Sequence, residues 1–161
     1  MRLERKNLFW GGFILGLGVL GALDGIVFHQ WPQWHHLVDS PDHRLELISD
    51  GIFNLLVTVL MVWACVKIFD ASRKDRLSRD PRLFWGAVLT GGGAFNLTEG
   101  LVNHQMLGLH HVKPGMHQFQ YDMLFLLSGI VLIAAGYHLS SSGGGRAAGL
   151  AGGKRPDQGA L

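Results

Sequence analysis

The chain has 161 residues, of which 48% are hydrophobic and 16% charged, with nine histidines and one cysteine. Soluble domains carry about 25% charged residues, so this composition favours a protein that lies in a membrane. The single cysteine, Cys65, excludes an intramolecular disulfide and a multi-cysteine zinc site. The formal net charge of +2 provides no basic surface, and we therefore expect no nucleic-acid partner.

Four apolar stretches are long enough to cross a bilayer, which takes about 20 helical residues. In chain order they run approximately from Leu8 to Phe28, Leu45 to Phe69, Leu83 to Asn103 and Phe119 to Tyr137. Lipid supplies no partners for free backbone polar groups, so each stretch must be a helix. The sequence therefore predicts an all-α integral membrane protein with four transmembrane helices in one domain, residues 1–139. Residues 140–161 are rich in Gly, Ser and Ala and predict a flexible cytoplasmic tail.

The basic residues predict how the helices are oriented in the membrane. Basic side chains precede the first stretch, fill the connection between the second and third stretches, and recur in the tail. The connections after the first and third stretches contain only Arg44 and Lys113. Because basic loops stay in the cytoplasm, both termini are expected there, in a multi-pass protein of the cell (inner) membrane. The two histidine-rich connections are then extracytoplasmic.

An internal repeat relates the two halves of the chain. Residues 9–36 align with residues 84–111 without a gap, and 11 of these 28 positions are identical. Unrelated segments of average composition would share about two. The matched polar pairs are Asp24/Glu99, His29/His104, His35/His110, His36/His111 and, with a small shift, Asp50/Asp122. The alignment predicts two tandem two-helix repeats, about 8–69 and 83–138, with parallel topology and a pseudo-two-fold axis along the membrane normal.

Glycines predict which helices meet. Small residues let membrane helices approach closely, and they recur in the first and third stretches at Gly12, Gly16, Gly21, Gly25 and Gly91–Gly93. This pattern favours packing of the first helix against the third. The other interpretation is that glycine is simply common in membrane helices.

The matched carboxylates and imidazoles lie near the outer membrane surface. Asp24 is 16 residues beyond Leu8, which places it about 24 Å along a helix that starts in the cytoplasm. Charged groups at such depth pair, titrate or bind ions. The candidate metal ligands are Asp24, His29, His35, His36, Asp50, Glu99, His104, His110, His111 and Asp122. Imidazole with carboxylate suits a transition metal, here copper or zinc, with iron not excluded.

Helix geometry limits which of these ligands can cooperate. At 100° per residue, Asp24 and His29 differ by about 140°, so we expect them on different sides of one helix. His43, His117 and His138 have no counterpart in the repeat. These three histidines are more simply explained as hydrogen-bonding side chains at helix ends.

Several segments together resemble the DUF2243 family of bacterial predicted membrane proteins. They are DGIVFHQ at 24–30, WHH at 34–36, DGIFN at 50–54, GGAFNLTEG at 92–100, NHQ at 103–105, HHVKPG at 110–115 and YD at 121–122. The resemblance extends roughly from Phe9 to Tyr137. It implies a membrane protein of uncharacterised function, with a link to copper-oxidase assembly factors that points toward copper.

Three functions are compatible with the sequence. The first is a protein that binds copper or zinc on the extracytoplasmic side, for metal handling or oxidase assembly. The second is a membrane-embedded metal-dependent enzyme, an oxidoreductase or hydrolase, acting on a lipid-soluble substrate. The third is proton or ion translocation along the same carboxylates. The lipid bilayer is the expected partner, and a membrane-protein partner or a homo-oligomer is left open.

Overall fold

Four long helices make up the described part of the chain, residues 3–74 and 80–142 of a computed structural model. They are α1 (Leu3–Asp24), α2 (His43–Lys74), α3 (Pro81–Thr98) and α4 (Gln118–Ser142). Two π-helices continue α1 and α3 directly, η1 (Gly25–Gln30) and η3 (Glu99–Met106). Within these residues there is no strand, so the all-α class is confirmed. Helix α4 extends to Ser142, and the rest of the predicted tail lies outside the described residues.

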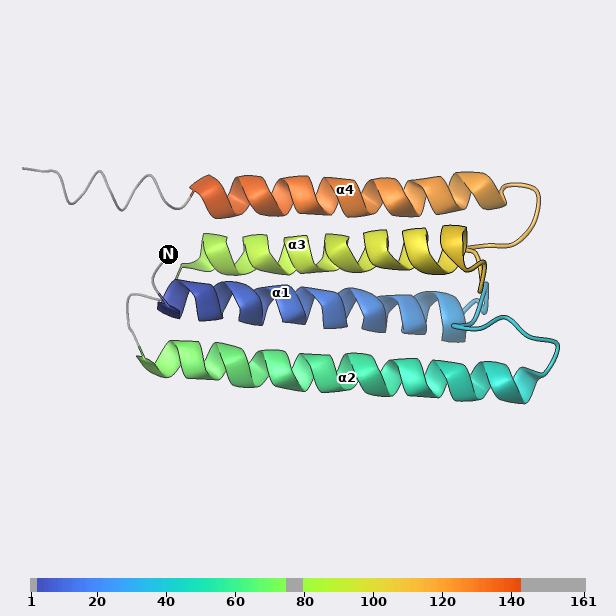
Figure 1. Cartoon of the computed structure of the whole chain (residues 1–161), viewed down its shortest axis with the longest axis horizontal. Coiled ribbons are helices and arrows are strands. Elements are labelled where there is room, and N and C mark those ends of the chain that lie inside the picture. Colours follow the sequence, from blue (N-terminus) through green and yellow to red (C-terminus); the bar gives the residue numbers. More distant parts are fainter. Residues whose placement is uncertain (1–2, 75–79, 143–161) are drawn as a thin grey trace, which may run out of the picture.

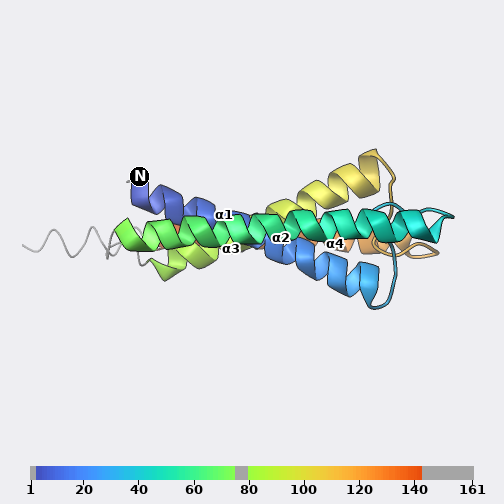
Figure 2. The same cartoon turned by 90° about the horizontal axis from the view of Figure 1, so that it is seen from below.

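The helices lie side by side in the order α4, α3, α1, α2 (Figure 1). At the centre, α1 and α3 cross one another and diverge toward both ends (Figure 2). A Cβ atom on Gly16 would strike the backbone carbonyl of Val88, and one on Gly91 would strike that of Phe13. The crossing therefore requires glycine at both positions. The predicted contact between the first and third helices is confirmed, although Gly25 faces α2 instead.

Three of the described helices are long and apolar enough to cross a membrane: Arg5–Gln30, His43–Arg73 and Gln118–Ser142. The third predicted stretch forms α3 and η3 but is not among them. Its glycines, with Thr90, Asn96 and Glu99, lower its hydropathy. Several of these groups face inward, and Asn96 Nδ2 donates to Ser128 Oγ on α4 at 2.8 Å. The fourth membrane span thus stays a prediction.

Apolar side chains cover the outer surfaces of α2 and α4. The exposed ones include Leu47, Ile48, Ile52, Leu55, Leu56, Val59, Val62, Val66 and Phe69 on α2, and Leu124, Leu127, Ile130 and Val131 on α4. In water such a surface would be unusually large for a monomer, whereas lipid is a matching solvent for it.

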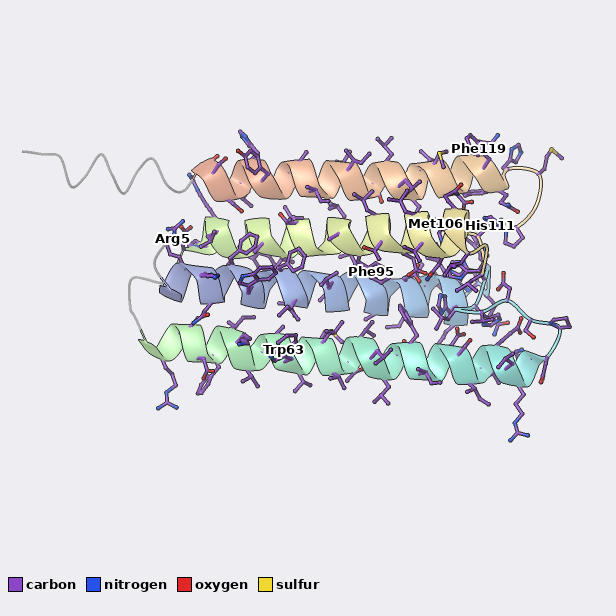
Figure 3. All side chains as sticks on the ribbon, viewed as in Figure 1. Arg5, Trp63, Phe95, Met106, His111 and Phe119 are labelled. Atoms are coloured by element: carbon purple, nitrogen blue, oxygen red, sulfur yellow. The ribbon has the colours of Figure 1, made fainter. Side chains whose placement is uncertain are left out.

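The two ends of the bundle differ in chemistry. At the end near the N-terminus, Asp80 accepts a hydrogen bond from Leu83 N at 3.0 Å and caps α3. Its other oxygen pairs with Arg5 at 2.9 Å. The loop between η1 and α2, residues 31–42, and the loop between η3 and α4, residues 107–117, lie at the opposite end, where Figure 3 labels His111. The histidines of the repeat gather at that end.

Candidate metal centre

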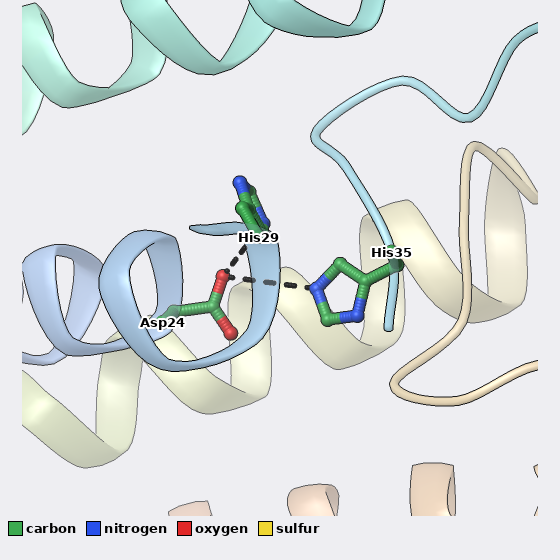
Figure 4. A group of neighbouring side chains, drawn as sticks. All are labelled: Asp24, His29 and His35. Carbon is green, nitrogen blue, oxygen red and sulfur yellow. Dashed lines mark ion pairs between the residues drawn. The ribbon is translucent and has the colours of Figure 1, made fainter. Parts of the chain in front are cut away.

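The π-helix η1 brings Asp24 and His29 together. In an α-helix, residues five positions apart point to different sides, but the i→i+5 hydrogen bonding of a π-helix stacks them. His29 Nε2 lies 3.1 Å from Asp24 Oδ2 (Figure 4). The expectation that these two side chains diverge is therefore wrong, because it assumed α-helical geometry throughout. In the second half of the chain, η3 carries Glu99 and His104 with the same separation along the sequence.

The loop after η1 adds a third side chain. Trp34 N donates to Phe28 O at 2.9 Å and turns the chain back over the helix end. His35 Nε2 then lies 4.0 Å from Asp24 Oδ2, as Figure 4 shows. The ring Nδ1 lies 2.8 Å from the carbonyl of Val112 and must carry the hydrogen of that bond. We call Asp24, His29 and His35 the first triad.

The second half of the chain builds the equivalent group, Glu99, His104 and His110, which we call the second triad. His110 Nε2 lies 3.1 Å from Glu99 Oε1. His110 Nδ1 donates to Leu37 O at 2.9 Å. His35 donates to the carbonyl of Val112, and His110 donates to that of Leu37. A backbone carbonyl of each loop therefore fixes a histidine of the other half of the chain. The two donors, His35 and His110, are 75 residues apart, and so are the two acceptors, Leu37 and Val112.

The two triads form one buried centre. The rings of His35 and His110 stack in parallel, with centroids 4.5 Å apart and an interplanar angle of 2°. His29 packs edge-on against His35, and His104 packs edge-on against His110, both at 4.8 Å between centroids. All six side chains of the two triads are buried. Four imidazoles and two carboxylates thus share a single region of the protein interior.

Buried polar atoms that make no hydrogen bond are concentrated in this centre. Within the described residues, the buried side-chain atoms without a hydrogen-bond partner are Asp24 Oδ2, His29 Nδ1 and Nε2, His35 Nε2, His104 Nδ1 and Nε2, and His110 Nε2. Every one belongs to a triad. An unsatisfied buried polar atom costs about 1–3 kcal/mol, so such a cluster indicates a place for a ligand.

Two further carboxylates lie beside the centre and link histidines to it. Asp50 Oδ2 lies 2.7 Å from His36 Nδ1, and Oδ1 accepts from Leu37 N at 2.8 Å. The same Oδ1 is 2.9 Å from His29 Nδ1, at an angle outside hydrogen-bond geometry. Each oxygen of Asp50 therefore faces a different imidazole.

The second half of the chain repeats this arrangement. Asp122 Oδ2 lies 2.7 Å from His111 Nδ1, while Oδ1 accepts from Val112 N at 3.0 Å. Asp122 Oδ1 is 3.5 Å from His104 Nδ1. Asp122 thus occupies the position that Asp50 has beside the first triad.

The ten candidate ligands of the sequence all lie at this end of the bundle, in two layers. Six form the triads, while His36, His111, Asp50 and Asp122 form the two adjoining acid–imidazole pairs. Sequence reasoning missed a further group, in which His43 and Glu46 lie next to His36. Neither residue has a counterpart in the repeat. Their i,i+3 spacing at the start of α2 was the available signal.

Electrostatics around His35 favour a bound proton when no cation is present. Burial lowers the pKa of His35, but the neighbouring Asp24 carboxylate and the Val112 carbonyl raise it by more, so the pKa lies above its ordinary value. A metal ion that binds His35 Nε2 competes with a proton for this nitrogen.

A comparison with known protein families places the chain. The DUF2243 family, described as predicted membrane proteins, matches residues 11–143, which include both triads. Neither the curated proteins nor the solved structures contain a match. Because the match extends over most of the sequence, this chain belongs to the DUF2243 family of predicted membrane proteins.

Proposed function

We propose that the protein binds two transition-metal ions, one in each triad, at the extracytoplasmic side of the membrane. The observation that carries this proposal is the cluster of buried nitrogen and oxygen atoms in the two triads that have no hydrogen bond. Most of them lie within 4.0 Å of an acidic or imidazole group instead. Each triad offers two imidazole nitrogens and one carboxylate oxygen, with these atoms within 4.8 Å of one another. Buried groups of this kind are normally paired or coordinate metals.

The distances between ligand atoms support the proposal. A tetrahedral ion with bonds of about 2.0–2.1 Å separates its ligand atoms by about 3.3 Å. Asp24 Oδ2 lies 3.1 Å from His29 Nε2, and Glu99 Oε1 lies 3.1 Å from His110 Nε2. A second pair in the first triad, Asp24 and His35, is 4.0 Å apart. This last distance has to shorten for all three ligands of the first triad to bind one ion.

The donor set restricts the metal. Imidazole and carboxylate suit Zn²⁺, Cu²⁺ and iron, whereas Cu⁺ prefers thiolate and thioether ligands. Cys65, the one cysteine of the chain, is exposed on α2 and belongs to neither triad. We therefore expect copper as Cu²⁺ or zinc, followed by iron.

Asp50 and Asp122 are best assigned as positioning residues. Metal-binding histidines usually donate their second ring N–H to a carboxylate or a carbonyl, which fixes the tautomer. Asp50 faces His29 Nδ1, and the carbonyl of Val112 accepts from His35 Nδ1. Both Nε2 atoms are then available as ligands. His36 and His111 complete these pairs from the loops.

We propose a four-span topology with both termini in the cytoplasm. Its support is the distribution of basic residues in the sequence, and α3 with η3 supplies the fourth span. The metal centre then lies near the extracytoplasmic surface, which suits a protein that stores metal or delivers it to a membrane partner. Single cysteines introduced at Asp42 and Ser72, in chains lacking Cys65, test this topology. An impermeant thiol reagent should label intact cells at Asp42 only, and the reverse pattern would contradict it.

Metal titration of the full-length protein in detergent tests the binding proposal. Wild-type protein should bind two ions with high affinity, His29→Ala and His104→Ala should each bind one, and the double variant none. His138→Ala is the matched control, because His138 lies near the end of α4 and belongs to neither triad. High-affinity binding that is absent from wild type, or unchanged in the double variant, would overturn the proposal.

A metal-dependent enzyme is the second candidate, and one observation favours it. Each triad supplies three protein ligands, which leaves a fourth position for water or substrate, as in catalytic zinc sites. Azide added to Co²⁺-loaded protein separates the two functions. A changed visible spectrum indicates an exchangeable position and catalysis, whereas an unchanged spectrum indicates a closed storage site.

A further inference from the structure

We propose that His36, His43 and Glu46 form a second, water-facing metal site, which captures a divalent transition-metal ion and loads the buried first triad. We call these three residues the outer triad. They lie beside the buried centre, on the loop after η1 and the first turn of α2. The loading role rests on the proposed function of the buried centre, whereas the site itself does not.

The ligand atoms of the outer triad have the spacing that a bound ion needs. Glu46 Oε2 lies 3.0 Å from His43 Nδ1 and 3.5 Å from His36 Nε2. Both values are close to the separation of about 3.3 Å between the ligands of a tetrahedral ion. One carboxylate oxygen thus faces two imidazoles from different segments of the chain.

The protein holds two of these ligands in place from behind. Glu46 Oε1 accepts from Ser40 N at 3.1 Å, which leaves Oε2 directed toward the histidines. His36 Nδ1 is held by Asp50 Oδ2 at 2.7 Å, which turns Nε2 toward Glu46. A histidine with a carboxylate behind it is the usual arrangement at metal sites. An ordinary i,i+3 ion pair would involve His43 and Glu46 alone. The position of His36 beside the same carboxylate oxygen is therefore additional support for a metal site.

Exposure increases along the outer triad toward water. The side chain of His36 is 10% exposed, that of Glu46 15%, and that of His43 66%. An ion can therefore bind His43 from solution and exchange its remaining water ligands for Glu46 and His36. The first triad, in contrast, is buried at all three positions. Its ion has to arrive through a more accessible group.

Asp50 connects the outer triad with the first triad. Its two oxygens face His36 Nδ1 at 2.7 Å and His29 Nδ1 at 2.9 Å. A single carboxylate therefore orients one ligand of each site. It also supplies negative charge between them, which favours the presence of a cation on either side.

Within the described residues, the outer triad has no equivalent beside the second triad. The 72-residue shift that aligns Asp50 with Asp122 places Gln118 where the first half has Glu46, and Gly115 where it has His43. In the same region, the ammonium of Lys113 lies 4.6 Å from the ring centroid of Trp34. A neutral amide, a glycine and a fixed cation do not make a metal site. The second triad therefore has no equivalent loading site of its own.

The test compares wild-type protein with the variant His43→Ala/Glu46→Gln, both full-length, metal-free and in detergent. The amide introduced by Glu46→Gln keeps an acceptor for Ser40 N, and His43 is mostly exposed, so the variant should fold. Co²⁺ is the probe. Its absorption reports the number of bound ions at equilibrium and the rate at which the buried centre fills after rapid mixing. His117→Ala is the matched control, an exposed histidine of the other loop that lies outside all three triads.

Wild-type protein should bind one weaker ion in addition to the buried ones. The variant should lose that ion, keep the buried occupancy at equilibrium, and fill the first triad at least about tenfold more slowly, the change expected when the path loses about 1.4 kcal/mol of stabilisation. His117→Ala should match wild type. A variant that retains the weaker ion would overturn the site, and an unchanged filling rate would overturn its loading role.

The metal-binding results distinguish a failure of the buried centre from a failure of the outer triad. His29→Ala/His104→Ala should retain the weaker ion while it loses the buried ones. If wild type binds only the weaker ion, the outer triad stands and the proposed function of the buried centre is wrong.

Discussion

Replacing Asp50 by asparagine should weaken metal binding at the first triad without removing a ligand. Asp50 Oδ1 faces His29 Nδ1 at 2.9 Å, and Oδ2 faces His36 Nδ1 at 2.7 Å. An asparagine has the same shape, and its amide oxygen takes the Oδ1 position, because Leu37 N donates to that atom. Its NH₂ group then faces His36 Nδ1. His29 keeps an acceptor but loses the negative charge behind Nδ1, which makes it a weaker ligand.

The expected loss is about 10–100-fold in metal affinity, the usual effect of removing a carboxylate behind a ligating histidine. It corresponds to about 1.4–2.7 kcal/mol of binding free energy. Asp122→Asn should cost less at the second triad, because Asp122 Oδ1 lies 3.5 Å from His104 Nδ1. The two variants thus form a matched pair at equivalent positions of the repeat.

Competition between the protein and a chromophoric chelator for Zn²⁺ measures this loss. Each variant should retain the two high-affinity binding steps, with the step of its own triad weakened. Asp50→Asn should also weaken the outer triad, because Asp50 Oδ2 holds His36 Nδ1. Thermal unfolding of the metal-free proteins checks that the variants fold alike. Affinity within about threefold of wild type for Asp50→Asn, in a folded protein, would refute the positioning role.

Three further predictions concern the fold and the metal-free centre. Gly16→Leu should prevent folding, since its side chain has no room against the carbonyl of Val88; Gly51→Ala, where nothing lies within 4 Å, should fold normally by size-exclusion chromatography. Stripping the metal with a chelator should lower the Tm, because an ion at about 1,000 times its Kd stabilises the fold by about 4 kcal/mol; equal melting curves would argue against bound metal. In metal-free protein, His35→Ala should lower the free energy of unfolding by about 1–3 kcal/mol, since the Val112 carbonyl loses its donor. Chemical denaturation measures this change, and an unchanged free energy of unfolding would contradict a stabilising bond between the two loops.

The repeat in the sequence predicts that the ten candidate ligands lie at one end of the bundle, because it relates residues without assuming a geometry, but it does not group them into triads. Hydropathy correctly predicts the four helices. The glycines, among them Gly16 and Gly91, correctly predict the contact between α1 and α3. The fourth membrane span stays a prediction, since the third helix keeps polar groups such as Asn96 that pair with another helix and lower its hydropathy.

The π-helices and the contacts between the loops leave no pattern that sequence periodicity detects. The π-helices change the angle per residue just where Asp24 meets His29, so a 3.6-residue period separates side chains that in fact touch. The hydrogen bond from His35 to Val112 joins two residues that lie in different loops and are 77 positions apart in the sequence. Glu46 joins His36 only through the path of the loop, which local sequence does not specify.

X-ray absorption of the metal bound to the full-length protein, purified without chelators, tests the central proposal most directly. The buried triads predict nitrogen and oxygen ligands only, at about 2.0–2.1 Å, with the multiple scattering of two imidazoles per ion. The pattern should disappear in His29→Ala/His104→Ala/His43→Ala/Glu46→Gln, which also lacks the outer triad. A sulfur ligand at about 2.3 Å, or a wild-type protein without metal, would contradict a histidine–carboxylate centre in this membrane protein.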